Sequence, residues 1–471
     1  MADINESEAI AKVLKLFEID RLKPEQKKIL EALLEKKDCM AVLPTGYGKS
    51  LPFQMLVSLK REMGDRDSKI IVCSPLVALM RDQCERLKNI PGIKAEYKCR
   101  SAEGDLNIEK GQFDYLYASP EALVGDKNWS YKLKEFSVST IVVDEFHTIS
   151  TWGENKEEDK KAFRKWFSYI GEVRSLFPDA SMLAPSATCT KKISRRVSKV
   201  LQMDDDLVEI RISPNKPNIK LVVRKIPNTV EMSMVWMIDA LCEETFPRTI
   251  VYCSTIKATA NIYSYIVTEK PEAVSSVEMF HSETPDDKKQ KVLESLKNPG
   301  SSLKLLVATS ALGMGVDFVN VYNVIVYGAP KSLVDLIQEK GRVGRDGKDS
   351  VALLLVNSYH LRDVNTEVKD MFKTEECRRV AMLTPFLTEL ELTEIRKQKG
   401  LHSCCDLCAV SCSCSACTSS FIEKLIYFIS ADDADDKSSD EDTESSYTYD
   451  PFDYEDDLDL SLVPDLDLNV E

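Results

Sequence analysis

One loop of the sequence has the residue types that hold the phosphates of a nucleotide. An apolar run, Cys39 to Leu43, leads into Pro44-Thr-Gly-Tyr-Gly-Lys-Ser50, which is followed by an amphipathic stretch. Gly46 and Gly48 allow a tight backbone path, so that successive N–H groups point at a polyphosphate and the next helix adds a favourable dipole. The predicted nucleotide contacts are Thr45, Gly46, Gly48, Lys49 and Ser50. The alternative is a chance glycine-rich turn before a helix.

A pair of carboxylates could supply the rest of the phosphate chemistry. The apolar run Thr140 to Val143 is followed directly by Asp144-Glu-Phe-His147. Open α/β sheets bind ligands at the carboxyl ends of their strands. We therefore expect Asp144 and the Ser50 hydroxyl to hold Mg²⁺, and Glu145 to polarise an attacking water. A solvated acidic pair on a surface loop is the alternative.

The cysteines form a third candidate group. Seven of the 14 crowd between Cys377 and Cys417, and the others are scattered before residue 300. A chain with no export signal is expected in a reducing compartment, where disulfides are rare. Thiolates that bind a metal are therefore the first hypothesis for the dense segment, with free surface thiols as the alternative.

Short apolar runs that alternate with amphipathic stretches must position these groups. This pattern is typical of buried parallel strands with crossover helices, so we predict an α/β fold with two such domains. The first series of predicted strands is Cys39 to Leu43, Lys69 to Ser74, Thr140 to Asp144 and Met182 to Ala184. The second series is Thr249 to Ser254, Val277 to His281, Leu303 to Thr309, Asn323 to Gly328 and Val351 to Val356.

Breaks in the pattern divide the chain into four parts. Two prolines and two asparagines in Ile212-Ser-Pro-Asn-Lys-Pro-Asn218 interrupt regular structure, so we place a boundary near residue 213. We predict a first domain at 1–212, a second at 213–360, a helical cysteine-rich subdomain at 361–430 and a disordered acidic tail at 431–471. The basic run Lys191 to Lys199 is interpreted as a solvated helix face, with a nuclear address as the alternative.

Composition excludes several classes of protein. With 471 residues, 43% hydrophobic and 30% charged, the chain is neither a small module nor collagen-like. No apolar run reaches the roughly 18 residues of a membrane span, and the polar start lacks a secretory signal. We therefore expect a protein of the nucleus or cytoplasm that is neither secreted nor bound to a membrane.

The net charge of −15 lies almost wholly in the tail. From Asp432 to Glu471 there are 17 acidic residues and one lysine, which leaves 61 basic and 60 acidic residues in the rest. A nearly neutral body neither supports nor excludes a polyanionic partner. The tail mixes acidic with aromatic residues, so it could bind a basic protein partner, compete with DNA, or only aid solubility.

Several stretches together resemble a known family. Three of them resemble motifs I, II and III of a superfamily-two helicase: Pro44 to Ser50, Asp144 to His147, and Ser186-Ala-Thr188. Three more narrow the resemblance to the RecQ group: Ser74 to Gln83 as motif Ia, Thr148 to Gly153 as the aromatic-rich loop, and Gln338 to Gly347 as motif VI. The resemblance implies two RecA-like domains and an ATP- and Mg²⁺-dependent enzyme. It also implies translocation from 3′ to 5′ on single-stranded DNA and unwinding of forked DNA in repair and recombination.

The resemblance also implies roles for single residues. Gln26 matches the glutamine that reads adenine, and Asp317 of motif V joins the nucleotide contacts. Arg342 and Arg345 of motif VI would face the γ-phosphate, where planar guanidinium groups stabilise developing charge. The implied nucleic-acid contacts are Arg81, Thr309 and Trp152, with the indole as a stacking platform.

The zinc site of RecQ proteins implies a ligand set for the cysteine-rich segment. Aligned on Cys405 and Cys408, the family pattern gives Cys377, His402, Cys405 and Cys408 as zinc ligands, with Cys404 as the alternative fourth ligand. Cys412, Cys414 and Cys417 could form a second site.

The sequence also departs from the family. Lys23 and Glu154 stand where the family usually has arginine and histidine, and we expect no winged-helix domain. Two alternative functions therefore remain: a DNA-binding adaptor with a degenerate motor, and a DNA-stimulated ATPase or translocase that does not unwind.

Overall fold

A computed structural model describes residues 6–74, 77–98, 102–124, 129, 132–152, 170–313, 318, 320–398, 400–414 and 420–427. Asp317, Cys417, Glu154 and the acidic tail lie outside the described residues, so the predictions made for them stay predictions. Within the described part, no helix is both long and apolar enough to cross a bilayer.

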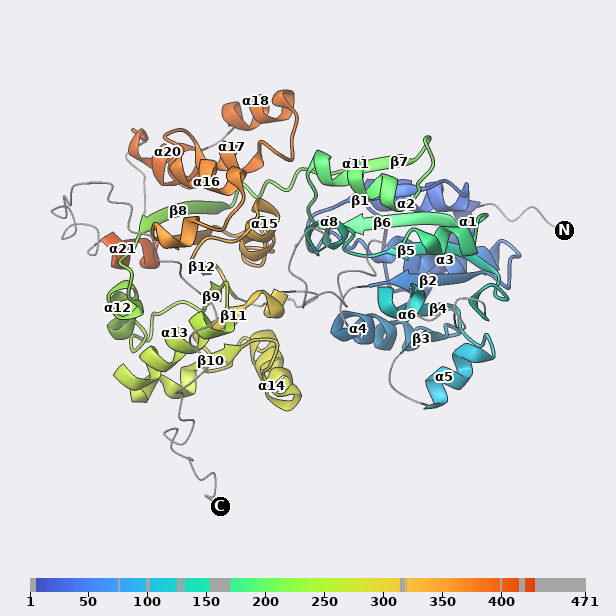
Figure 1. Ribbon diagram of the computed structural model, residues 1–471, viewed down its shortest axis with the longest axis horizontal. Helices are drawn as coiled ribbons and strands as arrows, with labels where there is room; N and C mark the ends of the chain where they lie inside the picture. The colour runs from blue at the N-terminus through green and yellow to red at the C-terminus, as the bar shows by residue number, and fades with distance from the viewer. Residues whose placement is uncertain are drawn as a thin grey trace, which may run out of the picture. The chain divides into compact units, whose positions relative to one another are not determined.

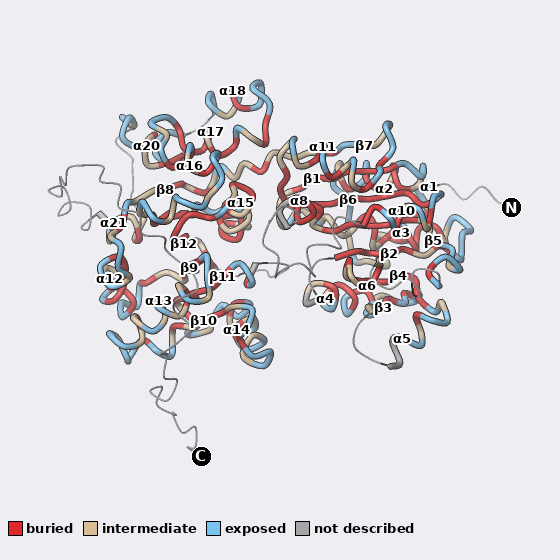
Figure 2. The backbone as a smooth tube through the Cα atoms, viewed as in Figure 1, coloured by how far each residue is buried: buried red, intermediate tan, exposed pale blue. Residues whose placement is uncertain are grey.

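The first lobe, residues 6–212, is built on a seven-stranded sheet with the order β3-β4-β2-β5-β6-β1-β7, in which every pairing is parallel. Its strands are β1 Cys39–Val42, β2 Lys69–Cys73, β3 Ala95–Tyr97, β4 Tyr115–Ala118, β5 Val138–Val143, β6 Ser181–Ser186 and β7 Val208–Arg211. Its helices are α1 Glu6–Leu16, α2 Pro24–Leu34, α3 Leu51–Glu62, α4 Val77–Lys88, α5 Ala102–Glu109, α6 Pro120–Val124, α8 His147–Trp152, α10 Glu172–Leu176 and α11 Lys191–Val200 (Figure 1). Because helices cover both faces, the central strands are buried along their length (Figure 2).

The second lobe, residues 219–361, has a six-stranded parallel sheet with the order β10-β11-β9-β12-β13-β8. Its strands are β8 Ile219–Lys225, β9 Thr249–Cys253, β10 Val277–Phe280, β11 Leu305–Thr309, β12 Asn323–Tyr327 and β13 Ser350–Val356. Its helices are α12 Val230–Ala240, α13 Ile256–Glu269, α14 Asp286–Lys297 and α15 Leu333–Lys340, with 3₁₀ turns at Pro271–Ser276, Ser310–Gly313 and Tyr359–Leu361. The chain therefore passes from the first sheet to the second between Arg211 and Ile219.

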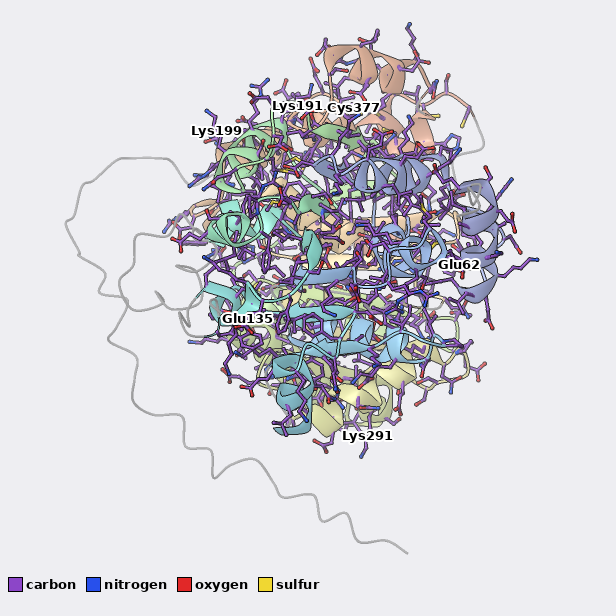
Figure 3. The ribbon with its side chains drawn as sticks, turned by 90° about the vertical axis from the view of Figure 1, so that its right-hand side faces the viewer. Glu62, Glu135, Lys191, Lys199, Lys291 and Cys377 are labelled. Carbon is purple, nitrogen blue, oxygen red and sulfur yellow. The ribbon has the colours of Figure 1, made fainter. Side chains whose placement is uncertain are left out.

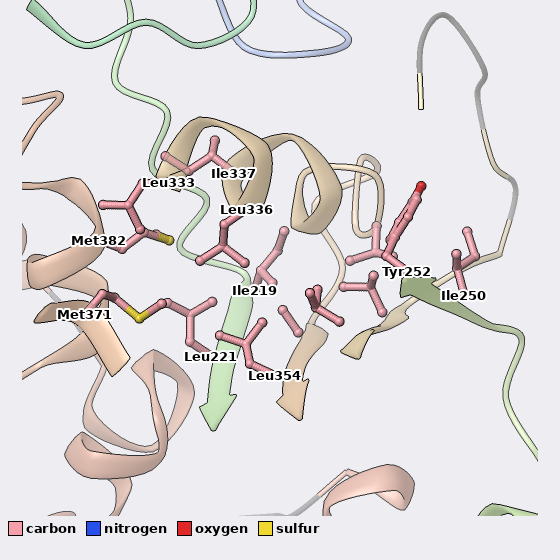
Figure 4. Packing of buried hydrophobic residues seen from close by; sticks show 14 of the residues in the cluster. Ile219, Leu221, Ile250, Tyr252, Leu333, Leu336, Ile337, Leu354, Met371 and Met382 are labelled. Atoms are coloured by element: carbon pink, nitrogen blue, oxygen red, sulfur yellow. The ribbon is translucent and has the colours of Figure 1, made fainter. Parts of the chain in front are cut away.

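A helical subdomain follows and packs on the second lobe. It contains α16 Thr366–Lys373, α17 Arg378–Leu383, α18 Glu389–Gln398, α19 Leu401–Cys404, α20 Asp406–Val410 and α21 Phe421–Tyr427. Met371 and Met382 of the subdomain share a buried cluster with Leu221 of β8 and Leu336 of α15 (Figure 4). The subdomain is therefore held by the hydrophobic core of the second lobe.

The predicted fold class is confirmed, and all nine predicted strands are present within a few residues of their expected bounds. The basic run also lies on a helix as expected. Lys192, Arg195 and Lys199 of α11 are exposed, whereas Ser194 and Val197 are buried, and Figure 3 labels Lys191 and Lys199 on this helix.

Candidate functional site

The phosphate-binding loop, Pro44 to Ser50, joins β1 to α3. Gly46 and Gly48 have φ angles of +83° and +86°, in the left-handed region that favours glycine. A Cβ atom on Gly48 would lie 2.6 Å from Nε2 of Gln26, while the space beside Gly46 is open. Ser50 is the N-cap residue of α3 but makes no capping hydrogen bond, so its hydroxyl is not committed to the helix.

Gln26 forms hydrogen bonds to the backbone of this loop. It is buried at the start of α2, and its Nε2 donates to the carbonyl oxygens of Tyr47, at 3.1 Å, and Gly48, at 3.0 Å. Its Oε1 accepts from the backbone N–H of Lys23 at 2.8 Å. Both ends of the Gln26 amide are thus used within the protein, so reading adenine would require these bonds to rearrange.

The predicted catalytic residues Lys49, Asp144 and Glu145 meet at the carboxyl ends of β1 and β5. Nζ of Lys49 donates to Oε1 of Glu145 at 3.0 Å. Oδ1 of Asp144 accepts from the backbone N–H of Glu145 at 2.9 Å, and its Oδ2 accepts from Nε2 of Gln83 at 3.3 Å. Glu145 has a φ angle of +48°, a strained conformation for a glutamate, of a kind that often marks functional sites.

The two neighbouring carboxyl groups have opposite pKa shifts. Burial and the charge of Glu145 raise the pKa of Asp144 to about 6. Burial alone would raise the pKa of Glu145, but Lys49 and His147 outweigh it and hold that pKa well below its usual range. Glu145 is therefore ionised at neutral pH and able to orient a water, while Asp144 carries a charge that a bound cation would stabilise.

His147 connects Glu145 to the second lobe. Its Nδ1 lies 2.8 Å from Oγ of Ser186 and 3.3 Å from Oε2 of Glu145. Its Nε2 lies 3.0 Å from Nε2 of Gln338, on α15, which also donates to Oγ1 of Thr188 at 3.4 Å. Our sequence analysis quoted these motifs but gave His147 and Gln338 no role, because their pairing joins residues from different lobes.

Arg342 and Arg345 follow α15 and lie near a third cation, Lys216. Nζ of Lys216 donates to the carbonyl oxygen of Gly341 at 2.8 Å, and its pKa is lowered to about 8 by burial and then by Arg345 and Arg342. Burial lowers the pKa of Arg342, while Glu145 is among the groups that favour its charged form. The acidic end of the first lobe and the basic end of the second thus interact electrostatically.

Among the described residues, no hydrogen bond or ion pair connects the three predicted nucleic-acid-binding residues to one another. Arg81 is exposed on α4, where its Nε donates to Glu85 at 3.0 Å. Thr309 ends β11, and its Oγ1 accepts from the backbone N–H of Ala311 at 3.4 Å. Trp152 ends α8, but its side chain lies outside the described part.

Four thiols gather in the helical subdomain, and they differ in one member from the predicted zinc set. The ligand atoms of Cys377, Cys404, Cys405 and Cys408 all lie within 4.8 Å of one another. His402 is not part of this group, so its assignment as the fourth ligand is corrected in favour of Cys404. The reason is helical geometry: residues two apart on α19 are rotated by about 200°, so His402 and Cys404 point to opposite sides.

The surroundings of this four-cysteine cluster suit thiolates. The backbone N–H of Cys408 points at Sγ of Cys405 at 3.4 Å, and Nε of Arg379 points at Sγ of Cys404 at 3.4 Å. A thiol hydrogen bond from Cys404 lowers the pKa of Cys377. Four thiolates with such donors around them fit a structural zinc ion.

Arg379 also binds the segment that connects the lobes. This side chain is 2% exposed. Its Nη1 donates to Oδ1 of Asn215, at 3.0 Å, and to the carbonyl oxygen of Lys216, at 2.6 Å. Its Nη2 donates to the carbonyl oxygens of Ile219, at 2.6 Å, and Cys404, at 3.1 Å. One guanidinium therefore joins the connecting segment, β8 and the cysteine cluster, a role that the sequence analysis missed.

Comparisons with known proteins agree with this geometry. Residues 23–196 match the DEAD/DEAH box helicase family, and residues 233–347 match the helicase conserved C-terminal domain. The probable ATP-dependent DNA helicase RecS of Bacillus subtilis is 32% identical over 82% of this chain and 73% of its own length. The ATP-dependent DNA helicase Q-like 2 of Arabidopsis thaliana is 27% identical over 87% of this chain, which spans 58% of that protein. The solved structure of S. cerevisiae Dbp5 bound to RNA and ADP BeF3 shares the fold, with a TM-score of 0.59, 17% identity, and coverage of 78% of this chain and 91% of that one.

Proposed function

This chain belongs to the RecQ family of ATP-dependent DNA helicases, and we propose that it couples ATP hydrolysis to 3′-to-5′ movement on single-stranded DNA and to unwinding of forked duplexes in repair and recombination. Hydrolysis of ATP by a helicase core follows from the matched domains and relatives. Polarity, translocation and the repair role are the proposed part.

Each residue of the nucleotide site has a task in this proposal. The loop N–H groups and Lys49 hold the phosphates, and Lys49 exchanges its ion pair with Glu145 for them. Asp144 and Ser50 would hold Mg²⁺, which neutralises phosphate charge when bound. Glu145 then orients the attacking water, and Arg342 and Arg345 stabilise charge on the γ-phosphate.

The observation that carries the proposal is the path from Glu145 through His147 to Gln338. In this proposal Glu145 orients the water that attacks the γ-phosphate, and only His147 separates Glu145 from Gln338 of the second lobe. Release of phosphate changes the position of Glu145, and His147 passes the change to α15. Alternating closure and release of the lobes is how such a site can move along a strand.

ATP hydrolysis with and without single-stranded DNA tests the enzyme. We expect DNA to stimulate phosphate release by the wild type and Lys49→Ala to reduce it by about a hundredfold or more. Lys27→Ala is the matched control, because Lys27 is exposed on α2 and pairs with Glu31. Absence of stimulation in the wild type would contradict the proposal.

Forked duplexes with one labelled strand test unwinding and polarity. We expect separation when the loading strand has a free 3′ tail and none with a 5′ tail. Stimulated hydrolysis without separation would instead indicate a translocase that does not unwind. RNA strands belong in the same assay, because phosphate contacts are common to both nucleic acids.

We also propose that Cys377, Cys404, Cys405 and Cys408 hold a structural zinc ion, which braces the helical subdomain against the second lobe. Zinc content of the purified chain, compared with that of Cys408→Ser, tests this assignment.

A further inference from the structure

A second group of metal-binding side chains lies on the helical subdomain, outside the four-cysteine cluster. It consists of His402 on α19 and of Cys412 and Cys414, which follow α20. Nδ1 of His402 lies 3.8 Å from Sγ of Cys412 and 3.3 Å from Sγ of Cys414. The side chains of His402 and Cys414 are exposed, and that of Cys412 is half-buried.

These distances are close to those between the ligand atoms of a tetrahedral zinc site. With Zn–S near 2.3 Å and Zn–N near 2.0–2.1 Å, tetrahedral angles put a sulfur and a nitrogen ligand about 3.6 Å apart. The two observed distances lie on either side of this value. An ion between the three atoms would therefore require only small side-chain movements.

The same helix separates the two groups. His402 points away from the four-cysteine cluster because it is two residues before Cys404 on α19, a rotation of about 200°. This orientation removes His402 from the first ligand set and brings it to Cys412 and Cys414. The two sets share no residue, so occupation of one does not exclude occupation of the other.

We propose that His402, Cys412 and Cys414 form a second zinc site, so that the chain binds two zinc ions. Two thiolates and one imidazole are ligands that zinc prefers. Three protein ligands leave the fourth position to water or to a donor from outside, and the exposure of the site makes that position accessible. We therefore expect this zinc to exchange with chelators faster than the zinc of the buried cluster.

Binding at this site would also fix the segment 411–414 onto α19. Ligands that are distant in sequence hold a loop when a metal joins them, since the metal-binding free energy stabilises the closed conformation. The proposal concerns the subdomain and does not depend on the helicase function.

Zinc stoichiometry of the full-length chain, purified under reducing conditions, tests the proposal. Elemental analysis should give two zinc ions per chain for the wild type and one for the Cys412→Ser, Cys414→Ser double variant. Cys242→Ser is the matched control, because Cys242 is an exposed cysteine of the second lobe, and it should retain two. One zinc ion in all three proteins, or two in the double variant, would overturn the proposal.

Cobalt substitution adds a readout of the ligands themselves. The thiolate-to-Co²⁺ absorption of the fully loaded wild type should fall by about a third in the double variant, since two of six thiolates are lost. A wild type with one zinc ion and a disulfide between Cys412 and Cys414, detected by mass, would refute the site. A chelator should remove one wild-type zinc ion rapidly and the other slowly, and a single rate for both would contradict the open fourth position.

Discussion

Replacing Asp144 by asparagine should stabilise the protein while it abolishes ATP hydrolysis. The carboxylate is buried next to Glu145, and these two causes raise its pKa from 3.8 to about 6. That difference corresponds to about 3 kcal/mol of unfavourable free energy in the charged folded form. An asparagine of the same shape removes the charge and therefore this cost.

The hydrogen bonds of the site allow the replacement. Oδ1 of Asp144 accepts from the backbone N–H of Glu145, which an asparagine oxygen can also do. Gln83 now donates to Oδ2, and its own Oε1 has no hydrogen-bond partner among the described residues. If the Gln83 amide turns over, Oε1 can accept from the new NH₂ group and Nε2 takes the place of the unpaired oxygen, so that the number of unpaired buried atoms does not rise.

The effect should depend on pH in a defined direction. Between pH 3.8 and about 6 the folded wild type binds a proton that the unfolded chain lacks, so this group makes the wild type more stable as the pH falls through that window. Asp144→Asn lacks this dependence. Its advantage should therefore be largest at pH 7.5 and about half as large at pH 5.

Thermal unfolding in magnesium-free buffer without nucleotide measures the effect. For a lobe of about 200 residues, about 3 kcal/mol raises the melting temperature by up to about 10 °C. Glu145→Gln is the matched comparison: it breaks the ion pair with Lys49 and should melt at or below the wild-type temperature at pH 7.5. If Asp144→Asn melts no higher than the wild type at pH 7.5, or gains equally at pH 5, the reasoning about Asp144 is wrong.

Three further variants test other contacts. Gly48→Ala should lose ATP hydrolysis at least tenfold, because its Cβ would meet Gln26 and its positive φ costs roughly 1–2 kcal/mol; steady-state kinetics and a melting curve measure both. Gln338→Ala should lower the DNA-stimulated kcat but leave nucleotide affinity unchanged, and an equal loss in the basal rate would argue against coupling through His147. Arg379→Met should destabilise the second lobe by about 3 kcal/mol or more in urea unfolding, because it leaves buried carbonyl oxygens unpaired, and a midpoint like that of the wild type would contradict its role as an anchor.

Most strands in the interior of each sheet could be predicted from the sequence, whereas the edge strands β3, β7 and β8 were missed; the fourth edge strand, β10, was predicted. Most of the nine predicted strands contain continuous apolar runs. Strand β8, Ile219–Lys225, lies at the edge of its sheet and contains three basic residues, Lys220, Arg224 and Lys225, and β3 at another edge has three residues. Strand β4, Tyr115–Ala118, has four fully buried residues like β1, but no phosphate-binding loop follows it to distinguish it from a buried helical segment.

The residues of the candidate site were also predicted only in part. Lys49, Asp144 and Glu145 could be placed together because parallel strands end at one edge of a sheet. The contact between His147 and Gln338 could not, since it requires both lobes. His402 was placed in the four-ligand set because the family pattern aligned it with a cysteine, whereas the structure groups Cys404 with the other three thiols.

Arg379 bonds both to Cys404 and to residues 215–219, so a change in the redox state of this thiol would act on the segment that connects the lobes. If the four-cysteine cluster holds zinc as proposed, an oxidant that removes the ion would also disturb the bonds of Arg379 to the segment that connects the lobes. We then expect the proposed translocation to fail before nucleotide binding does, so that the oxidised enzyme would hydrolyse ATP without moving along the strand.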